Sequence, residues 1–477
     1  GFRVVPIQDP GVKTEIGYDP YDRGLEDNIF VRYPDGEHWV AGVWPGDCVF
    51  PDFTDPNARI WWTKKTAKWV EESGVNGLWN DMNEPATWGQ DVPDMLEFSM
   101  DGRGGSHLEA HNVYGQLMAE SSRSGLLQCR PEERPFMLTR AGYAGIHRSA
   151  AVWSGDNIAS EEHYFLGIRL VLSMAMSGVA FSGPDVGGFV GDAGRNLFVR
   201  WISVASFFPF FRLHSMIDSR DNEPWSYGEL AEAIAGNYIR LRYKLLPTLY
   251  SAFKKSSITG KSIVKPYFWE KPFLEFDPAF QHQFIWCDQM LIIPAPSDHP
   301  SVKADLPEGD WFHLLTGEKY SGGSAIWLTA DIDTLPILVR AGSIFVTRNP
   351  GTHSMDLEIN TFQIHVFYGQ GESNFYFYDD DGVSISPAAD GFIEAELSFD
   401  FSRLQLGIKN MSGQKISSFT TIYLWHFPEI QMINFNNRSH SLQQGNWSWL
   451  ESLPNFDPFE DKGKSYFSTC QVIHIPD

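Results

Sequence analysis

The segment Asn76-Gly77-Leu78-Trp79-Asn80-Asp81 is a short apolar run that ends in a carboxylate. Directly before it, residues 57–73 carry apolar side chains at helical spacing, after the favourable helix start Asp55-Pro56 and before a stop at Gly74. The apolar run predicts a buried strand. The stretch therefore predicts a helix, a glycine stop, a buried strand and a polar residue at the strand end.

The same unit recurs between residue 1 and about residue 275. Alternating helices and strands indicate parallel strands joined by crossover helices. Polar residues at one strand end after another are typical of a (β/α)8 TIM barrel, whose active site lies at the carboxyl ends of the strands. A doubly wound sheet is the alternative, but the chain has no G-x-G-x-x-G phosphate loop. The other predicted elements are a helix over 106–124 that stops at Gly125, a strand over 136–138, strands near residues 4, 152, 180, 209 and 265, and a helix over 229–255 bent at Pro247.

The predicted strands number seven at most, whereas a closed barrel of this type has eight. The shortfall lies on the N-terminal side, so we expect the chain to lack the first barrel strands and to need a companion N-terminal fragment that covers the open edge. After about residue 275, short strands separated by Gly, Asp and Pro turns predict two β-sandwiches. The expected domains are an incomplete catalytic barrel over 1–275, a proximal β-sandwich over 276–350 and a distal β-sandwich over 351–477.

Composition excludes several classes of partner. The 477 residues have a formal net charge of −23, which argues against nucleic acid and anionic membranes as partners. The longest apolar run, residues 170–184, is shorter than the roughly 20 residues that span a bilayer. The four cysteines are far apart and form no C-x-x-C pair, so we expect no zinc site, and the chemistry below needs no other metal or cofactor.

Two carboxylates are the best candidates for chemistry. Asp81 and Asp156 each follow a predicted strand that contains a tryptophan, Trp79 or Trp153, and Asp185 is a third strand-end candidate. Hydrolysis of a glycosidic bond with retention needs two carboxyl groups, one as nucleophile and one as acid and base. A single strand-end Asp is often only a loop or helix cap, but several on successive strands favour catalysis. The two tryptophans fit either a buried core or a wall on which a sugar stacks.

Gly77-Leu78-Trp79-Asn80-Asp81-Met82-Asn83-Glu84-Pro85 resembles the nucleophile signature of glycoside hydrolase family 31, the α-glucosidase family. The resemblance implies that Asp81 is the catalytic nucleophile and that Glu84 supports its position and charge. Trp153-Ser154-Gly155-Asp156-Asn157 resembles the acid/base segment of the family, which implies that Asp156 is the proton donor.

Other segments resemble the parts of the family that hold the sugar in the −1 subsite. They are Arg140, the stretch 183–189, the stretch 211–214 and Val43-Trp44-Pro45-Gly46, and all motifs stand in the family's order. The substrate-binding residues that follow from the resemblance and from the two tryptophans above are Trp44, Trp79, Arg140, Trp153, Asp185, Phe189, Arg212 and His214. The family's substrate-binding Asp on an earlier strand and its N-terminal β-sandwich have no match in this sequence.

The resemblance implies a retaining, exo-acting α-glucosidase that releases glucose from the non-reducing end of α-linked gluco-oligosaccharides by double displacement. Three alternatives remain open on sequence alone. An α-transglucosylase uses the same residues, and an α-xylosidase or α-galactosidase is possible on this fold. A catalytically inactive carbohydrate-binding protein is the third, although both carboxylates are present.

Overall fold

The computed structural model describes residues 2–270, 277–353, 361–413, 419–435, 438–454, 464 and 466–475. The chain divides into two compact units. The first comprises Gly1–Gly155, Ser177–Ser182 and Gly382–Ser386, and the second comprises Asp156–Met176, Gly183–Asp381 and Pro387–Asp477. The predicted barrel segment contributes residues to both units.

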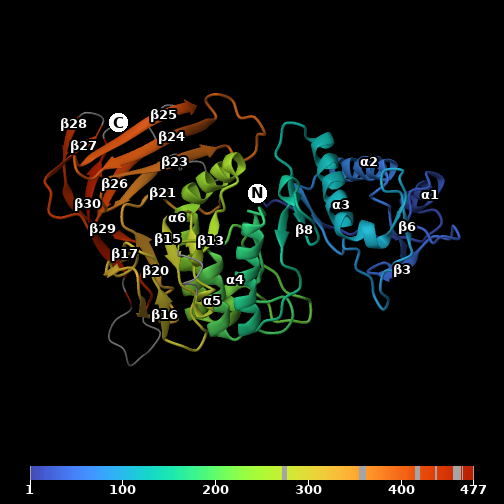
Figure 1. Ribbon diagram of the computed structural model, residues 1–477, viewed down its shortest axis with the longest axis horizontal. Helices are drawn as coiled ribbons and strands as arrows, with labels where there is room; N and C mark the ends of the chain where they lie inside the picture. Colours follow the sequence, from blue (N-terminus) through green and yellow to red (C-terminus); the bar gives the residue numbers. More distant parts are fainter. Residues whose placement is uncertain are drawn as a thin grey trace. The chain divides into compact units, whose positions relative to one another are not determined.

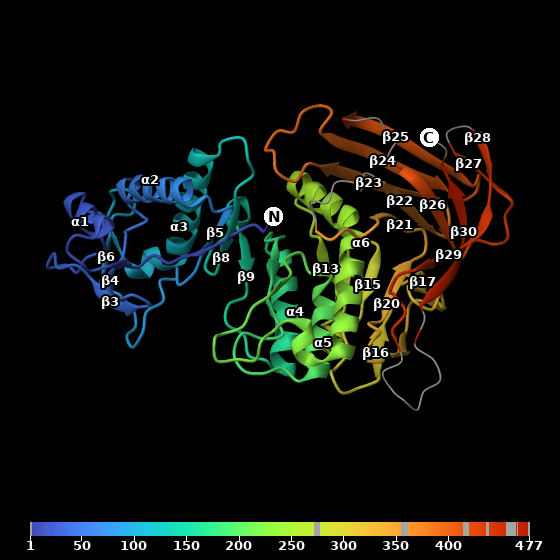
Figure 2. The ribbon, with the colours of Figure 1, turned by 180° about the vertical axis from the view of Figure 1, so that it is seen from behind.

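A parallel sheet organises the first unit. Its five strands hydrogen-bond in the order β1 (Ile7–Gln8), β5 (Gly77–Asn80), β8 (Phe136–Thr139), β9 (Ala151–Trp153) and β10 (Ser182–Gly183). Figure 2 shows β5, β8 and β9 beside the long helix α3 (His107–Cys129). The strands predicted near residues 78, 137 and 152 are thereby confirmed as parallel neighbours, and the strand predicted near residue 4 begins at Ile7.

Helix α2 (Pro56–Ser73) has the ends that the sequence predicts. The carboxylate of Asp55 accepts a hydrogen bond from the backbone N–H of Asn57 at 2.8 Å, which caps the helix N-terminus. Gly74 ends the helix with a φ of 69°, a left-handed conformation that glycine adopts without steric penalty. The chain then enters β5 within three residues.

The helices cover one face of the parallel sheet. Gln8 donates from Nε2 to Oγ1 of Thr66 in α2 at 3.0 Å, and Ser122 of α3 donates from Oγ to Oε1 of Gln8 at 3.2 Å. The amide of Asn80, which pairs with Gln8 in register, reaches Oε1 of Gln8 at 3.3 Å. Because strand side chains alternate between faces, the residues before and after this row point to the face opposite the helices.

Helix α3 does not stop at Gly125, so that prediction is wrong. The helix continues to Cys129, and Gly125 lies where α3 packs against α2. A Cβ atom on Gly125 would meet Cβ and Cγ2 of Thr66 at 2.8 Å, closer than van der Waals contact allows. Glycine serves here to let two helices approach, and local sequence does not distinguish this use from a helix stop.

The close contact makes a testable prediction for Gly125→Ala. The added methyl group overpacks the α2–α3 contact, and we expect the free energy of unfolding to fall by about 1–3 kcal/mol, measured by thermal or urea unfolding. Gly236→Ala, in helix α6 (Glu229–Thr259), is the matched control. Its Cβ would meet only the guanidinium at the end of the Arg240 side chain, at 3.4 Å, so helix propensity should make the substitution neutral or stabilising. Equal effects of the two substitutions would contradict the packing explanation.

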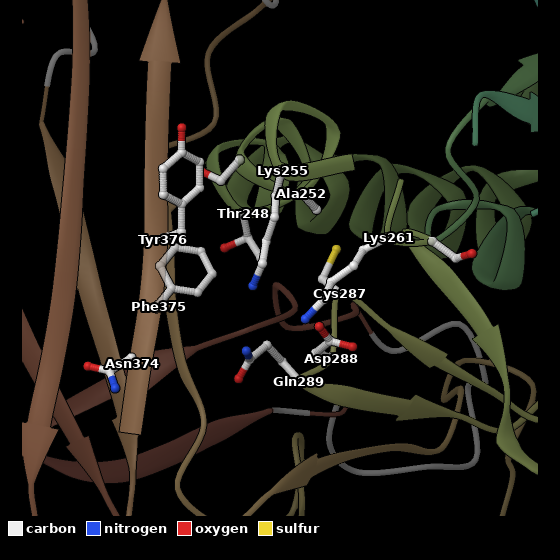
Figure 3. Close-up of a pocket in the computed structure, with 12 residues that line it drawn as sticks. Thr248, Ala252, Lys255, Lys261, Cys287, Asp288, Gln289, Asn374, Phe375 and Tyr376 are labelled. Atoms are coloured by element: carbon white, nitrogen blue, oxygen red, sulfur yellow. The ribbon is translucent and has the colours of Figure 1, made fainter. Parts of the chain in front are cut away.

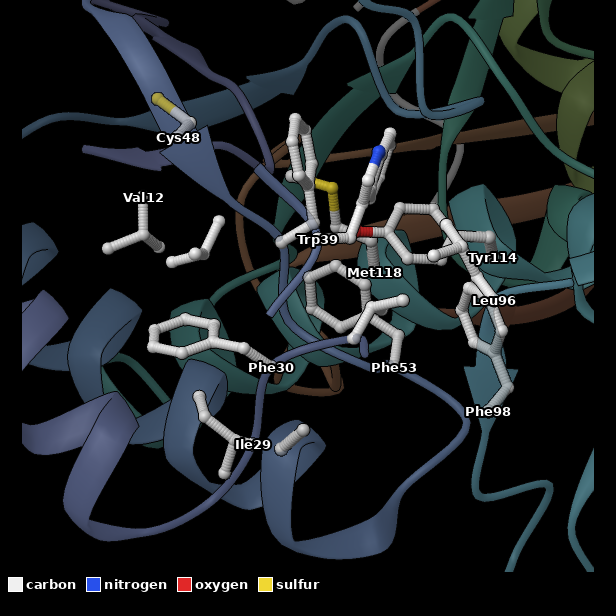
Figure 4. Close-up of a cluster of buried hydrophobic side chains, with 14 of the residues drawn as sticks. Val12, Ile29, Phe30, Trp39, Cys48, Phe53, Leu96, Phe98, Tyr114 and Met118 are labelled. Carbon is white, nitrogen blue, oxygen red and sulfur yellow. The ribbon is translucent and has the colours of Figure 1, made fainter. Parts of the chain in front are cut away.

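The first unit has a second layer, formed by the chain segment between β1 and β5 and by the segment that follows β5. It contains helix α1 (Asp19–Glu26), the antiparallel sheet β2 (Val12–Lys13), β4 (Gly46–Val49) and β3 (Val40–Val43), and the hairpin β6 (Glu97–Phe98) and β7 (Gly105–Ser106). In its aromatic core, Trp39 stacks on Phe50 with ring centres 4.5 Å apart. Phe53 meets Tyr114 of α3 edge-on at 5.1 Å, and both are labelled in Figure 4. This layer was not predicted, because its strands are only two to four residues long.

Three helices and strands of only two residues each begin the second unit. The helices are α4 (Glu161–Met176), α5 (Arg195–Ala205) and α6, which lie side by side in Figure 1. The strand predicted near residue 180 is reduced to β10 (Ser182–Gly183), followed by β11 (Asp185–Val186), and the apolar stretch near 209 precedes β12 (Arg212–Leu213). Helix α6 includes Pro247 and extends to Thr259, beyond its predicted end.

The strand predicted near residue 265 does not join the parallel strands. It is β13 (Val264–Pro266), and it pairs antiparallel with β14, in a sheet ordered β13-β14-β15-β20-β17-β18. The β14–β15 hairpin holds it through an ion pair between Lys265 and Asp288. The other strands of this sheet are β14 (Phe284–Trp286), β15 (Met290–Ile292), β17 (Asp310–His313), β18 (Lys319–Ser321) and β20 (Ile337–Arg340). A two-stranded sheet of β16 (Ser301–Asp305) and β19 (Ala325–Thr329) shares its hydrophobic core.

Two five-stranded sheets form the C-terminal part of the second unit. The first is β21 (Ile344–Arg348), β22 (Phe362–Phe367), β26 (Phe419–Trp425), β30 (Phe467–His474) and β29 (Gln443–Ser448). The second is β23 (Glu372–Asp380), β24 (Phe392–Asp400), β25 (Gln405–Gly413), β27 (Met432–Phe435) and β28 (Arg438–Ser441). Phe377 of the second sheet contacts Phe362 and Phe419 of the first, with ring centres 5.0 and 5.2 Å apart, so the sheets pack as a sandwich. The predicted alternation over 392–401 is confirmed, since buried residues alternate along β24.

Strand pairing crosses one of the predicted domain boundaries. β21 ends at Arg348, before the boundary expected at residue 350, yet it pairs antiparallel with β22 beyond it. Helix α6 supports both sheets: Thr248 donates to the carbonyl of Val346 at 2.6 Å, and Ser251 accepts from the N–H of Tyr378 at 3.0 Å. The boundary expected at 275/276 lies outside the described residues. Among the helices that the structure describes, none is both long and apolar enough to cross a bilayer.

Candidate active site

The parallel register places three charged residues in one row. Gln8, Asn80 and Thr139 are register partners across β1, β5 and β8. The next residues along the chain, Asp9, Asp81 and Arg140, therefore lie side by side just beyond the carboxyl ends of the strands. The side chain of Gln8 contacts both helices and the amide of Asn80 reaches Gln8, so by alternation Asp9 and Asp81 point to the opposite face.

Arg140 holds both acidic residues of the predicted nucleophile segment. Its Nη1 lies 3.0 Å from Oδ1 of Asp81, while Nε and Nη2 donate to the two carboxylate oxygens of Glu84 at 2.8 and 3.1 Å. The backbone N–H of Met82 also donates to Oδ1 of Asp81 at 2.8 Å. Hydrogen bonds from a guanidinium and an amide stabilise the carboxylate form, which is the form that a nucleophile requires.

The loop after Asp81 is fixed by Asn83, a residue that the sequence analysis quoted but gave no role. Its side chain donates to Oγ1 of Thr139 at 2.9 Å and to the carbonyl of Gly115 at 3.2 Å, and its Oδ1 accepts from the N–H of Ala141 at 3.2 Å. Asn83 is fully buried. It therefore ties the ends of β5 and β8 together and sets the geometry at which Arg140 meets Asp81.

The predicted tryptophans of the first unit occupy two places. Trp79 and Trp153, on β5 and β9, meet edge-on with ring centres 5.1 Å apart, and Trp153 is 1% exposed. Trp44 lies in the turn between β3 and β4, is 70% exposed and meets Trp88 edge-on at 4.8 Å. Trp88 belongs to no recognised motif, so the sequence analysis did not single it out. Together, Trp44 and Trp88 offer an apolar surface of the kind that pyranose rings contact.

The predicted residues of the second unit form a separate cluster. Asp185 is fully buried and forms an ion pair with Arg212, its register partner across β11 and β12. Phe189 stacks on His214 with ring centres 5.1 Å apart. Burial first, and then the neighbouring charge of Arg212, lowers the pKa of His214 to about 4, so its imidazole is neutral near pH 7.

Asp156, the predicted acid/base, is exposed and lies directly before the anchor of this cluster. The next residue, Asn157, donates from Nδ2 to the carbonyl of Asp185 at 2.9 Å, and its Oδ1 accepts from the N–H of Phe189 at 2.9 Å. The predicted catalytic pair is thus divided between the units, with Asp81 in the first and Asp156 as the first residue of the second.

Asp9 is the charged residue that the sequence analysis overlooked. Its pKa is raised to about 6, mainly by burial and next by the charge of Asp81, with a smaller contribution from Glu84, while Arg140 acts in the opposite direction. The signal was present in the sequence, because Asp9 directly follows the first predicted strand, as Asp81 follows the second.

One enclosed pocket of the second unit is distinct from these clusters. Its volume is about 40 Å³, and it lies between α6, the β14–β15 turn and β23 (Figure 3). Lys255 and Lys261 are among the residues that line it, and none of the predicted site residues does. Within the described part of the chain, no group of three or more His, Cys, Asp or Glu residues is arranged to hold a metal ion.

Comparison with known proteins assigns the fold. Residues 1–252 match the model of the glycosyl hydrolases family 31 TIM-barrel domain, and residues 260–345 match the glycosyl hydrolase family 31 C-terminal domain. These matches confirm the predicted fold class, a TIM barrel followed by β-sheet domains. The structure of a glucosidase II alpha subunit bound to Glc1Man2 has a TM-score of 0.85 at 27% identity and covers 99% of this chain and 53% of that chain.

Two similar curated proteins are glucosidases. Alpha-glucosidase 2 of Bacillus thermoamyloliquefaciens is 37% identical over 86% of this chain and 53% of its own length. The glucosidase 2 subunit alpha of Schizosaccharomyces pombe is 34% identical over 83% of this chain and 44% of its own length. The chain thus spans about half the length of these relatives. From the family models and from these similarities, the chain belongs to glycosyl hydrolase family 31.

Proposed function

We propose that the protein containing this chain is a retaining, exo-acting α-glucosidase. The observation that carries the proposal is the Asp81 carboxylate at the end of β5, held by Arg140 and by the backbone N–H of Met82. Family membership and the glucosidase names of the relatives support the same activity. The proposed substrate is an α-linked gluco-oligosaccharide or α-glucoside, cleaved at its non-reducing end.

The mechanism assigns one step to each carboxyl group. Asp81 attacks the anomeric carbon while Asp156, in its acid form, protonates the departing glycosidic oxygen, which leaves a β-linked glucosyl ester on Asp81. Asp156, now ionised, removes a proton from water, and the water displaces Asp81 to give α-glucose. Glu84 shares Arg140 with Asp81, and we assign it the role of orienting that guanidinium.

The remaining residues would bind the sugar in the −1 subsite. Arg140, Arg212, Asp185 and the neutral imidazole of His214 can exchange hydrogen bonds with sugar hydroxyl groups. Aromatic side chains would contact the apolar faces of the sugar; they are Trp44, Trp79, Trp153 and Phe189. A site built from hydrogen-bonding groups discriminates strongly against a sugar that leaves one of them unpaired.

We also propose that a companion N-terminal segment completes the barrel. Strand β1 lies at an edge of its sheet, and Ile7 within it is 49% exposed. An open apolar strand edge invites pairing with another chain segment. The chain matches only about half the length of these relatives, which is consistent with such a segment.

Trapping of the glucosyl-enzyme tests the proposal. The protein is incubated with a slow fluorinated α-glucosyl fluoride, and its peptides are analysed by mass spectrometry. We expect a fluoroglucosyl adduct on the peptide that contains Asp81 when the companion segment is present, and none on this chain alone. The matching β-glucosyl fluoride is the control and should leave no adduct.

Each other result has a definite meaning. An adduct on a different carboxylate would contradict the assignment of Asp81 as nucleophile. An adduct on this chain alone would contradict the need for a companion segment. The absence of any adduct in the complete protein, together with no release of glucose from α-glucosides, would contradict the α-glucosidase proposal.

A further inference from the structure

Asp9 and Asp81 occupy equivalent positions on neighbouring parallel strands. Each is the first residue after the strand, and the residues before them, Gln8 and Asn80, are register partners. Arg140 holds the same position after β8, on the other side of Asp81. The row therefore reads carboxylate, carboxylate, guanidinium, with Asp81 in the middle.

The positive charge at this end of the sheet is smaller than the negative charge around it. The guanidinium of Arg140 is engaged by Asp81 and by both oxygens of Glu84. Oδ1 of Asp9 is buried, and no hydrogen-bond partner for it occurs within the described part of the chain. A buried carboxylate oxygen without a donor is unfavourable when charged, because it has lost its hydrogen bonds to water and accepts none from the protein.

Among the described residues, the groups whose charge acts on Asp9 include one cation, Arg140. Burial, helped by Asp47 and Asp9, raises the pKa of the Cys48 thiol on β4 to about 11, so this group is neutral near pH 7. The charged groups that act on Asp9 are Asp81, Glu84 and Arg140. Ionised Asp9 would therefore be the third carboxylate at a single guanidinium.

We propose that Asp9 is a positioning residue for the nucleophile, neutral in the active protein, and that its ionisation draws Arg140 away from Asp81. The proposal rests on the nucleophile role proposed above for Asp81. Asp9 acts through Arg140 and need not touch the substrate. Its neutral form leaves the guanidinium to Asp81 and Glu84, which keeps the Asp81 carboxylate oriented for attack.

The pH range follows from the shifted pKa. Asp9 is neutral below about pH 6 and ionises above it, whereas an unfolded Asp ionises near 3.8. Because the folded-state pKa is the higher one, ionisation destabilises the folded protein. This penalty is absent below the unfolded value, develops as the pH rises, and is complete above about pH 6. Both kcat/KM and the free energy of unfolding should therefore decrease as Asp9 ionises.

Asp9→Asn tests the proposal in the purified protein at its natural length. Asparagine keeps the shape and stays neutral, so we expect the alkaline midpoint of kcat/KM to rise by about one pH unit. Relative to the unmodified protein, the unfolding temperature should rise by about 2 °C or more at pH 8, and this rise should shrink toward zero as the pH falls below 3.8, the unfolded-state pKa. Asp9→Ser is the second variant should the asparagine amide disturb folding.

Asp35→Asn is the matched control. Asp35 is exposed in a turn, where its Oδ1 accepts from the N–H of Glu37 at 3.1 Å, so neither pH profile should change. The proposal would be overturned if Asp9→Asn left unchanged both the alkaline midpoint of kcat/KM and the pH dependence of the unfolding temperature. The stability readout needs no catalysis: if it shifts in a protein that cleaves no α-glucoside, the charge coupling stands and the proposed function fails.

Discussion

Asp81→Ala should lower kcat on α-glucosides by about 10⁴-fold or more, while the fold is retained. Removing the carboxylate removes the group that forms the covalent intermediate. Arg140 keeps its two hydrogen bonds to Glu84, so the guanidinium is not left without a partner. Circular dichroism and thermal unfolding check that the variant is folded.

Added azide makes the assignment specific. In Asp81→Ala the anion can enter the space that the carboxylate vacates and attack from the β face, so the expected product is β-glucosyl azide with partial recovery of the rate. Asp35→Asn, an exposed carboxylate of the same unit, should keep full activity and give no azide product. Retention of ordinary hydrolysis by Asp81→Ala, or an α-configured azide product, would contradict the nucleophile role.

Local sequence predicted the elements that position this residue. The Asp55 cap, the helical spacing and Gly74 define α2, and the short apolar run after it is β5. Once β5 and β8 are parallel neighbours, the register brings Asp81 beside Arg140, which is 59 residues later in the chain. The ion pair therefore follows from the strand pattern together with the parallel topology.

Features that depend on distant partners were not predictable in this way. Local sequence predicts a helix stop at Gly125, because the contact of this glycine with Thr66 exists only when α2 and α3 are packed. The strand near 265 pairs with a strand that follows it, and nothing in its own residues specifies parallel or antiparallel pairing. Asp9 follows the strand-end rule, but its raised pKa arises from burial and from Asp81, which a single sequence does not display.

Asp156→Ala should show a different dependence on substrate from Asp81→Ala. General acid catalysis is needed only when the leaving group is a poor one, so kcat/KM for maltose-like substrates should fall by about 10²–10⁴-fold. For α-glucosyl fluoride or an activated aryl α-glucoside, kcat/KM should change by no more than about tenfold, because these groups depart without a proton. The glucosyl-enzyme should then accumulate, because the base that activates water is also missing.

Azide distinguishes this variant from the first by stereochemistry. In Asp156→Ala the anion attacks the β-linked glucosyl ester on Asp81 from the α face, so the expected product is α-glucosyl azide and turnover of the activated substrate rises. The neighbouring Asn157 keeps its bonds to Asp185 and Phe189, so the second cluster should remain intact. Equal losses of kcat/KM on substrates with good and with poor leaving groups would contradict the acid/base role of Asp156. Opposite azide anomers from the two variants would show that the reaction passes through two displacements, one on each face of the sugar.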